Sequence, residues 1–120
     1  MNRKEFVDSL KNVSVSADVK SRVLEVYNDV PEIVLKILTK YPSPELFDEN
    51  ESRTLSINEV LHAEEDNGVP FKTKKIVPIA DMGNNDFIVY NGATFIWCMY
   101  NILDETIFNE SKDFESLFFK

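Results

Sequence analysis

The 120-residue sequence contains little cysteine, histidine or glycine, with one, one and three residues respectively. The single cysteine, Cys98, cannot form a disulfide within the chain, and such a composition is typical of reducing compartments. Cys98 lies in an apolar run, so we expect a buried, inert thiol rather than an accessible nucleophile. One histidine excludes a histidine cluster for a metal ion, and the sequence has no glycine-rich phosphate loop before a helix.

Long apolar runs are also missing. No stretch approaches the roughly 20 residues that a membrane-spanning helix needs. Residues 1–11 lack the apolar segment of a secretory signal. We therefore expect a cytoplasmic protein without a membrane partner.

Basic residues are few relative to acidic ones. The 13 Lys and Arg residues against 21 Asp and Glu residues give a formal net charge of −8. A field of this sign repels the phosphates of nucleic acids and favours a basic protein surface as partner. Apolar residues make up 43% of the chain and include nine Phe, so we expect one folded domain over residues 1–120 with a single core.

The predicted sheet is centred on residues 76–101. Ile76–Ala80 is apolar and β-branched, and Asp81–Asp86 is a run of turn-forming residues. Asn91-Gly92 is the dipeptide that best suits a type I′ turn, because both central residues of that turn need a positive φ. We therefore predict a hairpin with Asn91-Gly92 as its two-residue loop.

This loop sets the register of the predicted hairpin. The expected pairs are Tyr90 with Ala93, Val89 with Thr94, Ile88 with Phe95 and Phe87 with Ile96. One side of the ribbon then carries Ile88, Tyr90, Phe95, Trp97 and Met99, and the other carries Phe87, Val89, Ile96, Cys98 and Tyr100. Because both sides are apolar, we expect both to be covered, which makes the hairpin central in the sheet.

Helices are predicted on both sides of this region. The expected helices, each with its cap, are Arg3–Lys11 after Asn2, a helix after Ser16, Glu32–Lys40 with a capping box at Asp29-Val30-Pro31-Glu32, a helix from the capping box at Ser56–Glu59 to about Glu65, and a terminal helix capped by Ser111. Gly68 is the expected residue after the fourth helix, and Phe114, Leu117 and Phe118 should share one face of the last.

The segments between these helices complete the prediction. Glu45–Ser52 is expected to be irregular or an edge strand, Arg53–Leu55 and Thr106–Phe108 short strands, and Val69–Lys75 a solvated connection. Helices, then a meander of strands, then a helix indicate an α+β fold with a central, mostly antiparallel sheet.

Three patterns were considered as sites of chemistry. Glu59-x-x-His62-x-x-Glu65 places three possible ligands along one helix, but a carboxylate-bridged site needs a second such motif, which the sequence lacks. The loop Asp81–Asp86 has an aspartate where a calcium loop needs glycine. The carboxylates of Asp81, Asp86 and Asp104-Glu105 could pair for acid–base work, although chance proximity is the stronger explanation in so acidic a chain. We therefore predict no catalytic residue, no cofactor, no metal and no enzymatic activity.

Four stretches together resemble a known family. Arg53–Val60 (RTLSINEV) is similar to an "R-x-L-S-x-x-E-I" entry into a helix, and Val77–Tyr90 (VPIADMGNNDFIVY) is similar to an "hPIA-x-x-G-x-GD-hhhh" strand–loop–strand. Ile107–Phe118 resembles a strand that runs into an "S-F-x-x-F" helix, and Val30–Tyr41 resembles an "LP-x-x-hh-x-hL" helix. By their order and spacing along the chain, these stretches resemble the SUKH superfamily, which consists of small α+β proteins related to the yeast cell-wall-synthesis regulator.

In bacteria, the resemblance implies an immunity protein that binds and neutralises a polymorphic toxin, often a nuclease or deaminase. A regulatory or scaffolding adaptor of the same fold is the alternative. An unrecognised enzyme or small-ligand binder, with a pocket lined by Asp81, Asp86 and Asp104, is a third class. For the first class, opposite charge would speed association with a basic toxin. The acidic residues expected to bind it are Glu45, Asp48, Glu49, Glu51, Asp81 and Asp86.

Overall fold

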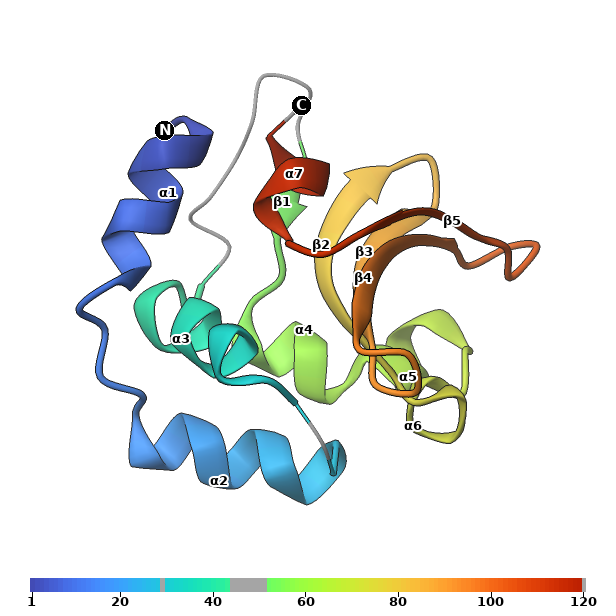
Figure 1. Ribbon diagram of the computed structural model, residues 1–120. Helices are drawn as coiled ribbons and strands as arrows, with labels where there is room; N and C mark the ends of the chain where they lie inside the picture. The colour runs from blue at the N-terminus through green and yellow to red at the C-terminus, as the bar shows by residue number, and fades with distance from the viewer. Residues whose placement is uncertain (29, 44–51, 120) are drawn as a thin grey trace.

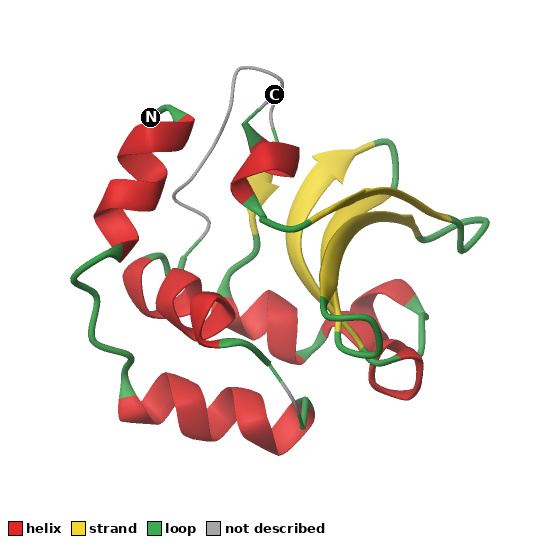
Figure 2. Cartoon of the chain, in the orientation of Figure 1, coloured by secondary structure: helices red, strands yellow, loops and turns green. Residues whose placement is uncertain are grey.

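The computed structural model describes residues 1–28, 30–43 and 52–119 (Figures 1 and 2). Within these ranges the chain is α+β, as predicted, with an open antiparallel sheet in the order β1-β2-β3-β4-β5. The helices are α1 (Arg3–Leu10), α2 (Ala17–Val26), α3 (Glu32–Lys40), α4 (Ile57–Leu61), α5 (Ala63–Asn67), α6 (Phe71–Lys74) and α7 (Glu115–Phe118). The strands are β1 (Arg53–Thr54), β2 (Ile76–Gly83), β3 (Asp86–Asn91), β4 (Ile96–Asn101) and β5 (Ile107–Ser111).

The first helices begin where their capping residues predict. The Asn2 side chain accepts from the Glu5 amide at 2.9 Å while the Glu5 carboxylate accepts from the Asn2 amide, which completes a capping box. Ser16 caps α2 by accepting from the Val19 amide at 3.2 Å. Each cap satisfies at least one backbone amide that would otherwise be unpaired at the helix start, which is why such short signals are visible in a sequence.

The cap predicted for α3 is wrong, although the helix spans the predicted residues. Its N-cap is Pro31, with φ of −71° and no side-chain hydrogen bond to the first turn, and Asp29 lies outside the described residues. A proline ring already holds the φ that a helix start requires. Four buried side chains then anchor α3 in the core: Val34, Leu35, Ile37 and Leu38.

The predicted loop and register of the β3–β4 hairpin are wrong. Asn91 pairs with Ile96 and Tyr90 with Trp97, so residues 92–95 form a four-residue loop. Asn91 stays in strand conformation and its carboxamide oxygen accepts from the amides of Ala93 and Thr94 at 2.9 and 3.3 Å. The loop closes at Phe95, which has φ of +60° and donates its amide to the Asn91 carbonyl at 2.8 Å. The asparagine therefore acts as a cap rather than as a turn residue with positive φ.

The assignment of side chains to faces nevertheless holds. The observed register differs from the predicted one by an even number of residues, and side chains alternate with a period of two. Ile88 faces Met99, Val89 faces Cys98 and Phe87 faces Tyr100. The described side chains from Phe87 to Tyr90 and from Trp97 to Tyr100 are all buried, so the hairpin is central and covered on both faces as expected.

A two-residue loop with two positive φ angles, as in a type I′ turn, occurs instead between β2 and β3. Gly83 pairs with Asp86, and the two loop residues Asn84 and Asn85 have φ of +53° and +66°. The β4–β5 connection instead repeats the β3–β4 loop. The Asn101 side chain accepts from two loop amides, and Glu105, with φ of +59°, donates to the Asn101 carbonyl at 2.8 Å. The two Tyr-Asn dipeptides at 90–91 and 100–101 thus mark two copies of one turn.

Helices cover both faces of the sheet (Figure 1). On one face Trp97 packs against Tyr90 and against Phe114, next to α7, with ring centroids 5.3 Å apart in each case. Phe6 of α1 then packs on Phe114 at 5.6 Å, so the two ends of the chain meet in one aromatic cluster.

The other face is covered by a segment that was predicted to be a solvated connection. Val69 and Phe71 are buried, Phe71–Lys74 is the short helix α6, and the Phe71 ring lies 6.2 Å from that of Tyr100. The prediction was wrong because the three lysines of this segment dominated its composition, while its apolar residues pack under the sheet.

Two further boundaries differ from prediction. The helix expected from Ser56 to about Glu65 is divided at His62 into α4 and α5, although the Ser56 capping box and Gly68 in left-handed conformation occur as predicted. Ser111 accepts from the Asp113 amide and does not cap α7. The Asp113 carboxylate takes that position by accepting from the Ser116 amide at 2.8 Å. The predicted face of α7 is confirmed, because Phe114, Leu117 and Phe118 are buried.

Candidate functional site: an acidic end of the sheet

Two of the predicted partner-binding residues lie at the turn between β2 and β3. Asp81 accepts from the Gly83 amide at 2.9 Å, and Asp86 accepts from the Asn101 carboxamide at 2.8 Å. Both are half-buried, so each carboxylate stabilises a turn while part of it reaches the surface. Asp81 thus binds a backbone amide of the turn, whereas Asp86 binds a side chain of β4. The remaining predicted residues, Glu45, Asp48, Glu49 and Glu51, lie outside the described residues.

Asn101 joins this turn to the β4–β5 loop. Its carboxamide nitrogen donates to Asp86, and its oxygen accepts from the amides of Leu103 and Asp104 at 3.0 and 3.2 Å. The Ile102 amide also donates to the Asn85 carbonyl at 2.9 Å. Asp81, Asp86, Asp104 and Glu105 therefore belong to one end of the sheet, which we call the acidic end.

One carboxylate of the acidic end, that of Asp104, is held in its charged form. Hydrogen bonds from the hydroxyl and the amide of Thr106 keep the pKa of Asp104 below its usual value. Glu105 accepts from the Tyr100 hydroxyl at 3.1 Å and lies 3.5 Å from the Lys74 ammonium. Burial, together with the nearby Glu105, raises the pKa of Tyr100 to about 12, so the tyrosine stays a neutral donor.

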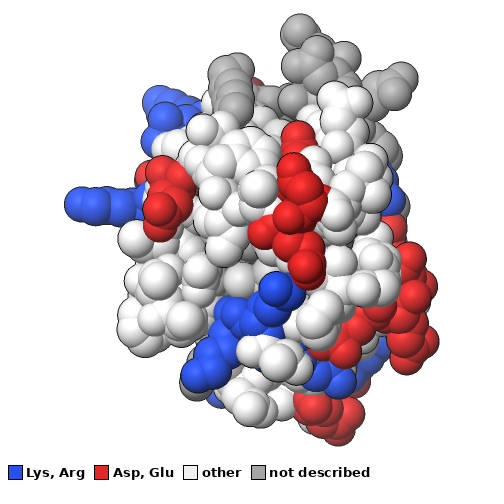
Figure 3. All heavy atoms as spheres, turned by 90° about the vertical axis from the view of Figure 1, so that its right-hand side faces the viewer, with Lys and Arg blue, Asp and Glu red and all other residues white. Residues whose placement is uncertain are grey.

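Two apolar side chains are exposed at the acidic end. Leu103 is 75% exposed in the β4–β5 loop and Ile107 is 50% exposed at the start of β5. Figure 3 shows a column of Asp and Glu on the face that carries this hairpin, with a group of Lys and Arg below it at the height of α6. An exposed leucine in a loop that also carries Asp104 and Glu105 is a surface that can contact a protein partner.

The Glu59-x-x-His62-x-x-Glu65 pattern has a structural role instead. Both Glu59 oxygens bind the Arg53 guanidinium, at 2.8 and 2.7 Å, and one also accepts from the Ser56 amide. This bidentate contact lowers the pKa of Glu59. The His62 Nδ1 atom lies 2.8 Å from the Asn58 carbonyl oxygen of its own helix. Among the described residues, no group of three or more His, Cys, Asp or Glu side chains is placed to hold a metal ion.

Cys98 is a buried thiol, as predicted. It is 1% exposed on the central strand β4, and burial raises its pKa to about 11. The thiolate that nucleophilic chemistry requires is therefore scarce at neutral pH.

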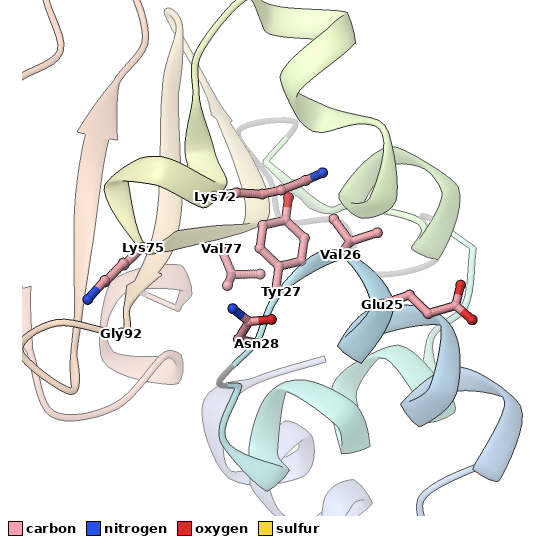
Figure 4. Close-up of a pocket in the computed structure, with 8 residues that line it drawn as sticks. All are labelled: Glu25, Val26, Tyr27, Asn28, Lys72, Lys75, Val77 and Gly92. Atoms are coloured by element: carbon pink, nitrogen blue, oxygen red, sulfur yellow. The ribbon is translucent and has the colours of Figure 1, made fainter.

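The sequence did not predict a cleft at the opposite end of the sheet. A cleft of about 440 Å³ is lined by Glu25, Val26, Tyr27, Asn28, Lys72, Lys75, Val77 and Gly92 (Figure 4). A second hollow of about 410 Å³ beside it is lined by Val30, Pro31, Tyr90, Gly92 and Phe95. These residues come from four separate parts of the chain, so no local motif could have revealed them.

Comparisons with protein-family models, with curated proteins and with solved structures found no match to this chain. Across the described residues, no helix has the length and apolar character needed to cross a membrane.

Proposed function

We propose that this chain is a non-enzymatic immunity-type protein that binds and neutralises a basic toxin in the bacterial cytoplasm. The acidic end of the sheet is the proposed contact surface. The observation that carries the proposal is that Asn101 joins the Asp86 carboxylate to the amides of Leu103 and Asp104, in a loop where Leu103 is 75% exposed.

Two properties of this surface suit a protein inhibitor. Carboxylates at the rim of an interface attract a basic partner and raise the association rate, while a central apolar side chain supplies contact energy. Both loops are short and cross-linked by hydrogen bonds, so little ordering entropy is lost on binding. Nucleases and deaminases that act on nucleic acids present basic surfaces, and a rim of carboxylates can occupy the place of phosphates.

The experiment is co-expression of the chain with each toxic protein encoded beside its gene, with growth as the readout, followed by association kinetics for the rescued pair. Asp81→Asn, Asp86→Asn and Asp104→Asn are combined in one variant, because the amide oxygen keeps the hydrogen-bond acceptor while the charge is lost. A matched control combines Asp18→Asn, Glu65→Gln and Asp66→Asn, which are exposed positions elsewhere. Each triple removes three negative charges and takes the formal net charge from −8 to −5.

The first triple is expected to lower the association rate constant about tenfold at low salt and to flatten its salt dependence, whereas the control changes it little. Equal effects of the two triples would remove the acidic end from the proposal. Absence of rescue by the unmodified chain, or its purification with a cell-wall enzyme or kinase instead, would replace immunity by the adaptor function.

A further inference from the structure

The cleft at the other end of the sheet has an apolar floor. Tyr27 and Val77 are 5% and 3% exposed, and half-buried Val26 lies beside them. The Tyr27 hydroxyl donates to the Val60 carbonyl at 2.9 Å, so its one polar atom is already paired. Figure 4 shows these side chains facing the middle of the cleft, between the end of α2 and the helix α6.

The rim of the cleft carries two lysines that have no acidic partner among the residues that the structure describes. Lys72 and Lys75 form no ion pair within the described residues, whereas Lys74 between them pairs with Glu105 at 3.5 Å. Glu25 points away from the centre in Figure 4. Glu64, the other nearby carboxylate, accepts from the Lys72 amide at 2.7 Å. Two free ammonium groups at one opening are unusual on a chain of net charge −8.

Lys75 is also held in a strained conformation. It ends α6 with φ of +60°, where glycine or asparagine is usual, and its carbonyl accepts from the Gly92 amide at 2.7 Å. Such a conformation costs free energy in a non-glycine residue, and here it lies at a position whose side chain lines the cleft. Exposed Asn28 adds a carboxamide donor at the opposite wall.

We propose that this cleft binds a small organic anion, with an apolar body against Tyr27 and Val77 and an anionic head group between Lys72 and Lys75. The volume falls in the range of about 300–1,000 Å³ that is usual for small-molecule sites. Lysine ammonium groups on flexible stems can close on a carboxylate or a phosphate alike. The site is separate from the acidic end and does not depend on the proposed immunity function.

The test is a titration of the isotope-labelled chain with indole-3-acetate, followed by two-dimensional amide NMR. Indole-3-acetamide is the neutral match with the same apolar body, and phenyl phosphate compares the second head group. The carboxylate is expected to shift the amides of Lys75, Val77 and Gly92, and to bind at least about tenfold more tightly than the amide, as a charge-assisted contact requires.

Variants distinguish the effect of the Lys72 and Lys75 ammonium groups on binding from an effect on folding. Lys72→Gln with Lys75→Gln should weaken indole-3-acetate binding about tenfold, whereas Lys4→Gln with Lys112→Gln removes the same charge away from the cleft and should leave binding unchanged. Lys75→Gly should raise the thermal midpoint by relieving the strained φ while it weakens binding. Equal binding of the acid and its amide, shifts outside the cleft, or equal loss in both double variants would overturn the proposal. Tighter binding of phenyl phosphate would support it and assign a phosphate as the preferred head group.

Discussion

Trp97 offers the most direct test of the double-covered sheet. It is 4% exposed, and its ring lies 5.3 Å from the rings of both Tyr90 and Phe114. Replacing a buried tryptophan by alanine costs about 3–5 kcal/mol through lost transfer energy and the cavity left behind. Each aromatic pair contributes about 0.5–1.5 kcal/mol beyond the burial of apolar area. We therefore expect Trp97→Ala to lower the free energy of unfolding by about 4 kcal/mol.

The assay is urea unfolding followed by far-UV circular dichroism, because the variant loses the only tryptophan. With an m-value of about 2 kcal/mol/M, the midpoint should fall by roughly 2 M. A domain of this size has a free energy of unfolding of roughly 6–18 kcal/mol, so the variant should still fold. Lys74→Ala is the control, since a surface ion pair contributes within about 0.5 kcal/mol.

A double-mutant cycle refines the test. Trp97→Leu and Phe114→Leu, alone and together, should give a coupling energy of about 0.5–1.5 kcal/mol if the two rings touch as the structure shows. A loss below about 1.5 kcal/mol for Trp97→Ala, with no coupling to Phe114, would refute the reasoning, because that face of the sheet would then be open.

The remaining predictions concern charge, thiol reactivity and backbone strain. The pKa of Glu59 lies below its usual value of 4.5 in the folded chain, so its contribution is present above that pH and is lost as the pH falls through the folded pKa. Arg53→Gln should lower the urea midpoint at pH 7, and the two midpoints should converge in acid; a constant difference would contradict this. Cys98 should react with a thiol reagent at pH 8 only after unfolding, as its pKa of about 11 and its burial require, and absorbance of the released thiolate measures it; fast reaction of the native chain would show that β4 opens. Phe95→Gly should raise the free energy of unfolding by about 0.5 kcal/mol, because relief of the positive φ outweighs the entropy of glycine; a lower thermal midpoint would mean that the ring, although 74% exposed, stabilises the fold.

The sequence predictions were correct mainly where the structure depends on interactions between residues close together in the chain. Asn2, Ser16 and Ser56 each satisfy amides within three residues of themselves, and their helices begin where expected. The sides of the central hairpin were also predicted, because alternation survives an even change of register. The turn type was not, since Asn91 could act as a turn residue or as a cap, and its Oδ1 contacts decide between them.

The candidate sites were predicted only in part, because they depend on contacts between distant segments. Asp81 and Asp86 were identified as acidic turn residues, but the connection of Asp86 to the loop of Asp104 depends on Asn101, which is 15 residues after Asp86 in the chain. The cleft between α2 and α6 had no local signal, because its apolar floor and its lysines come from distant segments.

By itself, the sequence determined where the capped helices α1, α2 and α4 begin, which sides of the central strands are apolar, and that the chain is strongly acidic. These properties depend on neighbours within about one helical turn, or on alternation along one strand. Only the tertiary structure decided which carboxylates share a surface, where two lysines lie without an ion pair to any described residue, and that Phe6 meets Phe114 at the far end of the chain. Those contacts form only when distant segments are brought together, and the energy that holds them is shared among many buried side chains that no single motif encodes.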